Sequence, residues 1–287
     1  MKISLSVIIV SFKNIGILRD CLDSVEKFND IGDGLEVIVS DNSPDNTLYD
    51  TIRSEYEWVK IIKNENIGFG AGNNRGYEIS SGEVLLFLNP DTVLVEPVFG
   101  FALEKFESDK NLAMFGVQLI DRNLENNDSF FIMDKYGIFS TMRSHYARRT
   151  GKYRDGKMFL CGANLFVRRS SFEQAGRFDE NIFMYKEEAD LIKRIKLHSS
   201  AKKTAFFKDK RIIHLEGGTE DADSSKAINQ LSRLTEADRY YAEKWNLSYL
   251  KILKQRRRFH RFKLFVLRCL FKRKRAVDTK KIINFLN

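Results

Sequence analysis

Two short polar stretches of this chain carry residue types that enzymes use to hold metal ions and move protons. The first, Asn89-Pro90-Asp91, follows the apolar run Leu85–Leu88. A run of this length is typical of a buried strand, and proline cannot continue the hydrogen-bond ladder, so the chain must turn. The turn leaves Asn89 and Asp91 at the carboxyl edge of a sheet, where open α/β folds bind ligands. A carboxylate there can coordinate Mg²⁺ or Mn²⁺, which in turn can hold a diphosphate, although Asn-Pro-Asp is also a common turn.

The second stretch is Glu187-Glu188-Ala189-Asp190, in which carboxylates cluster at the expected start of a helix. Acidic residues are stabilised at a helix N-terminus by the macrodipole, which would explain the cluster without any catalytic role. The same carboxylates could supply a general base at the mouth of the sheet. His214 ends an Ile-Ile strand, where a single histidine is more often structural than a ligand.

Two further segments follow predicted strands and could contact a ligand. Asp41-Asn42 either closes a turn or places Asp41 on a base or ribose hydroxyl. The glycine-rich run Gly68–Gly72 follows the third strand, whereas the dinucleotide fingerprint belongs after the first. The glycines here either let the backbone approach a ligand closely or simply form the start of a helix.

The hydrophobic pattern predicts the elements that position these residues. Buried strands are expected at Ser4–Ser11, Leu35–Ser40, Val59–Lys63, Glu83–Leu88, Ala113–Leu119 and Met158–Val167, and a last one ends near His214. Helices are expected at Ile15–Phe28, Val98–Glu107 and Glu187–His198, among others. Alternating strands and helices predict an α/β fold with a mostly parallel sheet. Asp121–Lys157 is polar and rich in Tyr, Arg and Gly, so we expect an irregular, mobile loop there.

Length and composition suit a soluble globular protein, either one large α/β domain or a domain with an appendage. The chain has 287 residues, of which 43% are hydrophobic and 30% charged. Its three cysteines are far apart and indicate reduced thiols in a cytosolic compartment. No secretory signal is visible, and no apolar run approaches the roughly 18 residues of a spanning helix. We expect a catalytic domain over 1–220 and a helical, basic C-terminal extension over 221–287.

The positive charge is concentrated at the C-terminus. Of the net charge of +9, residues 251–287 carry 14 Lys/Arg against one acid, which leaves 34 Lys/Arg and 38 Asp/Glu, a net of −4, in residues 1–250. Aromatic residues including Phe259, Phe262 and Phe265 group on one side of a helical wheel. Such a helix fits an anionic membrane surface, contacted through 251–275. The alternatives are packing on the catalytic domain, and nucleic-acid binding, which no recognised motif supports.

Taken in order, these motifs resemble the family 2 glycosyltransferases with a GT-A fold, particularly the rhamnosyltransferase-like members that build bacterial surface polysaccharides. The resemblance covers about residues 4–220. Its matching segments are Val7–Asn14, Asp41–Ser43, Asn66–Gly70, Asn73-Asn74, Leu88–Thr92, Gly176–Glu180, Tyr185–Leu191 and His214.

The resemblance implies a role for each segment. The nucleoside-binding edge would comprise Val10, Ser11, Phe12 and Asp41. The loop over the nucleotide and donor sugar would comprise Asn66, Gly68, Phe69 and Asn73. Asn89-Pro90-Asp91 stands where the family has its Asp-x-Asp motif, with Asp91 the implied ligand of Mg²⁺ or Mn²⁺. His214 matches a position that can complete that metal site. Glu187-Glu188 occupies the place of a Glu-Asp pair whose second member is commonly the catalytic base.

Two departures from the family pattern bear on these roles. Glu188 replaces the usual Asp, which lengthens the side chain by a methylene and leaves Glu187 as an alternative base. Asn89 replaces the first Asp and leaves one charged metal ligand in the motif. The Gln-x-x-Arg-Trp signature of processive synthases is absent, so transfer of one sugar per encounter is expected.

The implied reaction is inverting, metal-dependent transfer of a sugar, with rhamnose suggested by the resemblance, from a nucleoside-diphosphate donor. The acceptor would be a hydroxyl of a lipid-linked saccharide at the cytoplasmic face of the inner membrane. The alternatives are a catalytically silent nucleotide-sugar-binding scaffold and a sugar nucleotidyltransferase, which would need a Gly- and Arg-rich signature that Ser11–Asn14 lacks. The glycosyltransferase interpretation requires Asp91, Glu188 and His214 to meet at one end of the sheet.

Overall fold

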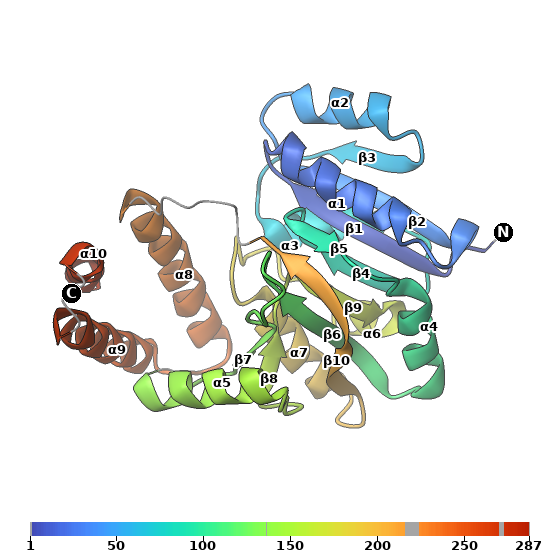
Figure 1. The fold of residues 1–287 in the computed structure, drawn as a ribbon. Helices are drawn as coiled ribbons and strands as arrows, with labels where there is room; N and C mark the ends of the chain where they lie inside the picture. The colour runs from blue at the N-terminus through green and yellow to red at the C-terminus, as the bar shows by residue number, and fades with distance from the viewer. Residues whose placement is uncertain (1, 136, 216–223, 270–272, 287) are drawn as a thin grey trace.

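The computed structural model describes residues 2–135, 137–215, 224–269 and 273–286, and its centre is an eight-stranded sheet (Figure 1). The strand order is β3-β2-β1-β4-β9-β6-β10-β5. These strands are β1 (Leu5–Ser11), β2 (Leu35–Asp41), β3 (Val59–Lys63), β4 (Val84–Leu88), β5 (Thr92–Leu94), β6 (Leu112–Ile120), β9 (Asn164–Arg168) and β10 (Lys203–His214). The helices around it are α1 (Ile15–Lys27), α2 (Thr47–Glu55), α3 (Phe69–Glu78), α4 (Phe99–Ser108), α6 (Arg169–Gln174) and α7 (Glu187–His198).

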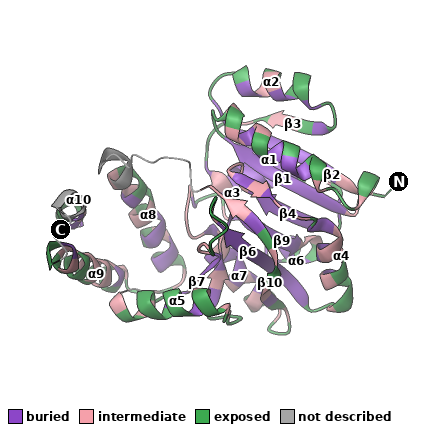
Figure 2. Cartoon of the chain, viewed as in Figure 1, coloured by how far each residue is buried: buried purple, intermediate pink, exposed green. Residues whose placement is uncertain are grey.

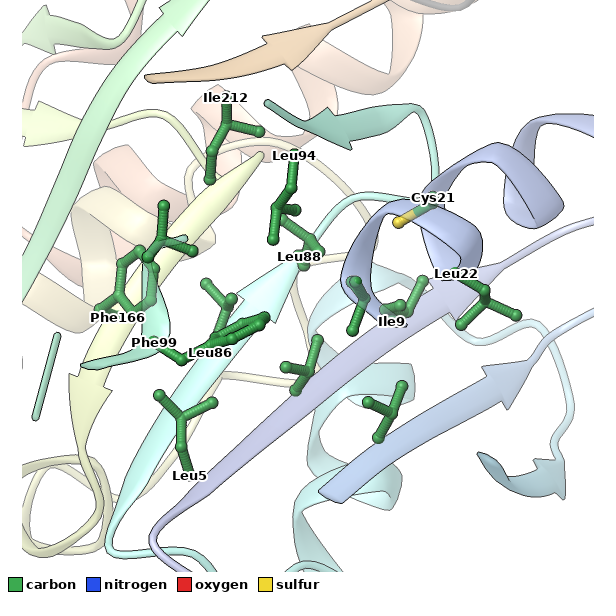
Figure 3. Packing of buried hydrophobic residues seen from close by; sticks show 14 of the residues in the cluster. Leu5, Ile9, Cys21, Leu22, Leu86, Leu88, Leu94, Phe99, Phe166 and Ile212 are labelled. Atoms are coloured by element: carbon green, nitrogen blue, oxygen red, sulfur yellow. The ribbon is translucent and has the colours of Figure 1, made fainter. Parts of the chain in front are cut away.

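The N-terminal half is a parallel sheet with helices on both faces, as the sequence predicts. β1 pairs in parallel with β2 and with β4, and β2 pairs in parallel with β3. Every residue of β1 is buried, which explains its continuous run of β-branched and apolar side chains. On one face Leu5 and Ile9 pack with Leu22 of α1, while on the other Ile8 packs with Tyr77 of α3. Figure 3 shows the first of these clusters.

The other half of the sheet contains an antiparallel strand that the sequence interpretation did not separate. β9 lies between β4 and β6 and runs antiparallel to both. The expected single strand Met158–Val167 is wrong, because the chain forms β8 (Met158–Leu160), breaks at 161–163 and resumes as β9. β8 instead pairs with β7 (Phe130–Ile132) in a separate two-stranded sheet.

The expectation of an irregular loop over Asp121–Lys157 is also wrong. Besides β7 this stretch forms α5 (Ile138–Thr150), which Figure 1 shows at the bottom of the molecule. Phe130 is buried in the same cluster as Ala147 of α5. Tertiary packing therefore orders a stretch whose local composition favours a loop.

Three further helices follow the sheet: α8 (Ser224–Lys244), α9 (Tyr249–Cys269) and α10 (Arg273–Phe285). In Figure 1, α8 stands beside the sheet and α9 and α10 lie beyond it. The expected domain boundary at residue 220 falls outside the described residues. Within the described part of the chain, no helix combines the length and the apolar character that crossing a bilayer requires.

Candidate active site

The turn after β4 brings Asp91 against His214. β5 and β10 pair antiparallel with Thr92 opposite His214, and the Leu215 N–H donates to the Asp91 carbonyl at 2.8 Å. This backbone pairing places His214 Nε2 3.4 Å from Asp91 Oδ1. Both side chains are largely buried, with 15% and 19% of their surface exposed. The contact between these two predicted metal ligands is therefore fixed by strand register.

Asn89 adds an oxygen with no hydrogen-bond partner to the same turn. Its Oδ1 is buried and unpaired within the described residues, while its backbone N–H donates to the Ala163 carbonyl at 3.0 Å. A buried carbonyl oxygen without a partner costs free energy unless a ligand satisfies it. Within the described residues no three His, Cys, Asp or Glu side chains converge closely enough to bind a metal on their own.

Glu188 approaches the other side of the segment 161–163. It lies in the first turn of α7, and the Gly162 N–H donates to its carboxylate. A side-chain carbon at Gly162 would collide with Glu188 Oε1, so only glycine leaves room for this carboxylate. Since Ala163 is hydrogen-bonded to Asn89, one short segment links the Asp91 turn to Glu188.

Cys161, which begins this segment, is within electrostatic reach of both carboxylates. Burial raises the pKa of its thiol to about 12, and the negative charges of Glu188, Asp128 and Asp91 raise it further. The sequence interpretation missed this segment because it assigned 158–167 to one strand. A glycine inside a strand pattern was the available signal for a break or a close approach at Gly162.

The two adjacent glutamates differ in their charge. Burial raises the pKa of Glu188 to about 7, although the Gly162 N–H and the Lys186 ammonium act in the opposite direction. Burial also raises the pKa of Glu187 well above its usual range, and the nearby charge of Glu188 adds to the shift. Two carboxylates this close in a dry site do not both ionise at neutral pH, so Glu187 keeps its proton and Glu188 titrates.

The turn that delivers these glutamates has an unusual backbone. Tyr185 and Lys186 both adopt left-handed conformations, with φ of 73° and 79°. Such conformations cost non-glycine residues roughly 1–3 kcal/mol each and persist only where their surroundings hold them. Here Lys186 Nζ lies 3.4 Å from Oδ1 of Asp238, a fully buried residue of α8. A residue from the C-terminal helices thus contacts the turn beside the glutamates, which no local pattern indicated.

The residues expected at the nucleoside edge lie at the carboxyl ends of β1 and β2. Asp41 is fully buried, and its oxygens accept from the Ser43 N–H at 2.8 Å and Lys63 Nζ at 2.9 Å, so it organises its own turn. Val10 is buried as well. Ser11 has a buried hydroxyl with no partner within the described residues, and Phe12 is 48% exposed. Phe12 is therefore the most exposed of these edge residues, whereas Ser11 is buried and offers a hydroxyl that has no partner among the described residues.

The glycine-rich loop contacts the segment that leads to α7. Gly68 has a φ of +130°, and a Cβ there would lie 2.7 Å from the Phe183 carbonyl oxygen. The Phe69 N–H donates to that carbonyl at 2.8 Å. Asn73 Nδ2 donates to the Phe69 carbonyl, and its buried Oδ1 has no partner among the residues that the structure describes. Asn66 is exposed. The loop therefore joins the β3 end of the sheet to the glutamate-bearing turn.

Comparison with known proteins identifies the family and the fold of the chain. A curated relative, the rhamnosyltransferase WbbL of Escherichia coli (strain K12), is 26% identical over 189 residues, which cover 60% of this chain and 70% of the relative. Among solved structures, the mannosyltransferase PcManGT from Pyrobaculum calidifontis, in complex with GDP-Man and Mn²⁺, aligns with a TM-score of 0.63 and 13% identity, covering 100% of this chain and 84% of that one.

TarS of S. aureus aligns with a TM-score of 0.57 and 16% identity, covering 89% of this chain and 42% of that one. These neighbours confirm the expected GT-A-type fold. The sequence profile of Glycosyl transferase family 2 matches residues 6–176, more than half of the sequence. The chain belongs to glycosyl transferase family 2 and is a glycosyltransferase.

Proposed function

We propose that this glycosyltransferase inverts the anomeric configuration of a sugar that it moves from a nucleoside-diphosphate donor to an acceptor hydroxyl. The observation that carries the proposal is the position of Glu188: its carboxylate, with a pKa of about 7, flanks the same segment as Asp91. A base with a pKa near the working pH combines a usable ionised fraction with a useful proton affinity.

In this mechanism Glu188 accepts the proton of the acceptor hydroxyl as that oxygen attacks the anomeric carbon from the face opposite the diphosphate. The Gly162 N–H orients the carboxylate toward the reacting hydroxyl. Protonated Glu187 contributes no competing charge beside it. A single attack from the opposite face inverts the configuration.

The residues around Asp91 fit a divalent cation, Mg²⁺ or Mn²⁺. Asp91 Oδ1 and His214 Nε2 lie 3.4 Å apart, so the two side chains would be able to hold one such ion together. The buried, unpaired Asn89 Oδ1 is a further oxygen of the kind that these ions prefer. The cation would neutralise charge on the leaving diphosphate. The Mn²⁺ in the PcManGT structure supports this assignment by analogy of fold.

The relatives guide the choice of substrate. The likeness to WbbL, a rhamnosyltransferase, favours rhamnose as the sugar. The family resemblance of the sequence motifs favours bacterial surface polysaccharide synthesis as the setting. Phe12, Asn66 and Phe69 would line the donor side, with Ser11, Asn73 and Asn89 supplying polar contacts. A lipid-linked saccharide acceptor agrees with membrane attachment through 251–275, where Phe262 and Phe265 of α9 are exposed. Residues 270–272 of that stretch lie outside the described residues. The enzyme would then work at the cytoplasmic face of the inner membrane.

Two single substitutions separate the roles of the glutamates. Glu188→Gln should lower kcat at least about 10²-fold, the scale for losing a positioned base, while Glu187→Gln should cost much less. The rate of the unaltered enzyme should rise with pH up to about 7 and then level off, because the ionised form of Glu188 is the base. Donor turnover with added Mn²⁺, followed over this pH range, measures both effects. Wild-type turnover in Glu188→Gln would remove this residue from the role of base.

A further inference from the structure

The outer face of α5 carries an exposed apolar stripe that no site described above uses. Phe139, Met142 and Tyr146 are 87%, 65% and 60% exposed and follow the spacing of one helix face. Figure 2 shows the run of exposed residues along α5. The opposite face of the helix is the one that packs, through Ser144 and Ala147. Three large apolar side chains on one outward face are a recognised mark of an interaction surface.

The stripe lies within a strongly basic, acid-free stretch of the chain. Residues 135–154 contain six Lys/Arg and no Asp or Glu, although residues 1–250 as a whole carry a net charge of −4. On a helical wheel Arg143 and Arg149 flank the stripe on either side, and both are exposed. Lys152 Nζ lies 5.6 Å from the centre of the Tyr146 ring. An apolar face bordered by cations is complementary to the surface of an anionic bilayer.

A cavity of about 680 Å³ opens beside the same helix, and neither Asp91 nor Glu188 is among the residues that line it. Its apolar lining includes Met133, Met158 and Trp245, and its charged lining includes Arg143 and Arg154. Two lysines of α7 that also line the cavity, Lys193 and Lys196, form ion pairs with acidic residues. Within the described residues no acid pairs with Arg143 or Arg154. The recess therefore offers unpaired guanidinium groups beside apolar surface, a combination suited to a lipid phosphate.

We propose that α5 is a membrane-contacting helix, which inserts Phe139, Met142 and Tyr146 among anionic lipids while the flanking arginines contact lipid phosphates. The inference rests on the membrane attachment proposed for 251–275 and adds a second contact outside the C-terminal helices. α5 and α9 contact one another, so the two proposed membrane contacts are neighbours in the structure. The catalytic part would then be oriented on the membrane rather than tethered to it at one end.

Sedimentation of the full chain with lipid vesicles tests the proposal. Phosphatidylcholine vesicles with phosphatidylglycerol are compared with phosphatidylcholine alone. The double variant Phe139→Ser/Met142→Ser should weaken binding to the anionic vesicles about tenfold or more, because two inserted side chains are lost. Arg143→Gln/Arg149→Gln should weaken it about 25-fold, roughly fivefold for each cation near the surface, and only on anionic vesicles.

Matched controls use exposed residues elsewhere. Leu124→Ser, 59% exposed, and Arg53→Gln on α2 should leave binding unchanged. Equal binding of both α5 variants and the controls overturns the proposal. If Phe262→Ser/Phe265→Ser then weakens binding, attachment by α9 stands without α5. A native chain that does not sediment with anionic vesicles, or that binds a DNA duplex through α5 instead, also overturns it. Donor turnover without vesicles should be the same in every variant. A negative result for membrane binding by α5 can therefore be told apart from a failure of the proposed transfer reaction.

Discussion

The buried ion pair between the glutamate-bearing turn and α8 leads to a quantitative prediction. Asp238 is fully buried, accepts from Arg256 Nε at 2.7 Å, and lies 3.4 Å from Lys186 Nζ, a long ion pair rather than a strong hydrogen bond. Asp238→Asn keeps the shape of the side chain and removes its charge, which leaves two cations without their shared anion. Removal of one partner from a buried pair costs about 3–5 kcal/mol. For a chain of this size that loss lowers Tm by roughly 6–20 °C.

The same substitution should change the pH dependence of the reaction. Burial lowers the pKa of Lys186, and Asp238 opposes that shift, so loss of Asp238 favours the neutral amine. The positive charge of Lys186 in turn lowers the pKa of Glu188. With Lys186 partly neutral, Glu188 should titrate above its present value of about 7, and the acid limb of the rate profile should move to higher pH. Lys186→Met, which has no charge at any pH, should move it in the same direction.

Thermal unfolding and donor turnover as a function of pH, measured on the same preparations, test both effects. Asp209→Asn, an exposed acid elsewhere on the chain, is the matched control and should behave like the unaltered protein. In a double-mutant cycle, Lys186→Met and Asp238→Asn should couple by about 0.5–3 kcal/mol. An Asp238→Asn protein that keeps its Tm and its pH profile would refute the reasoning, as would strictly additive effects of the two substitutions.

Two further substitutions test other parts of the structure. Burial raises the pKa of Glu36, but hydrogen bonds from Lys60, Ser6 and Ser81 outweigh it and lower the pKa to about 2. Glu36→Gln should therefore lower the free energy of unfolding by about 3 kcal/mol at neutral pH. This difference should persist above pH 4.5 and decline as the pH falls toward 2, which denaturant titrations at several pH values measure. Gly162→Ala should displace the Glu188 carboxylate and lower kcat about 10²-fold with little change in Tm, whereas Gly16→Ala, with open space around it, should leave kcat unchanged.

The parallel half of the fold follows from sequence because its signals are local. β1 and β4 are continuous runs of apolar residues that are buried on both faces, and such runs have few other solutions. The predicted helix Glu187–His198 matches α7 residue for residue. The contact of Asp91 with His214 was likewise foreseeable, because each residue ends an apolar strand and strand ends meet at one edge of a sheet.

The remainder depends on contacts between distant segments. β9 runs antiparallel to its neighbours β4 and β6, a pairing with distant segments that its own sequence does not encode. α5 has few buried side chains and a polar composition, so neither length nor periodicity indicated a helix. The environment of Glu188 could not be predicted for the same reason, since Gly162 and Lys186 act on its pKa from two different segments.

The C-terminal helices contribute to the environment of the glutamates as well as to any membrane contact. Asp190, fully buried on α7, accepts from Trp245 Nε1 at 3.0 Å and pairs with Lys244 Nζ at 2.7 Å, while Asp179 lies 2.6 Å from the same ammonium. Together with the Asp238 pair, these contacts join α8 to both ends of the turn that carries Glu187 and Glu188. The boundary expected at residue 220 marks the end of the family resemblance, whereas these ion pairs cross it. A left-handed turn and a protonated glutamate are both costly, and they persist only where buried partners hold them. Because those partners come from α8, loss of the C-terminal helices should perturb Glu188 even when the acceptor is soluble.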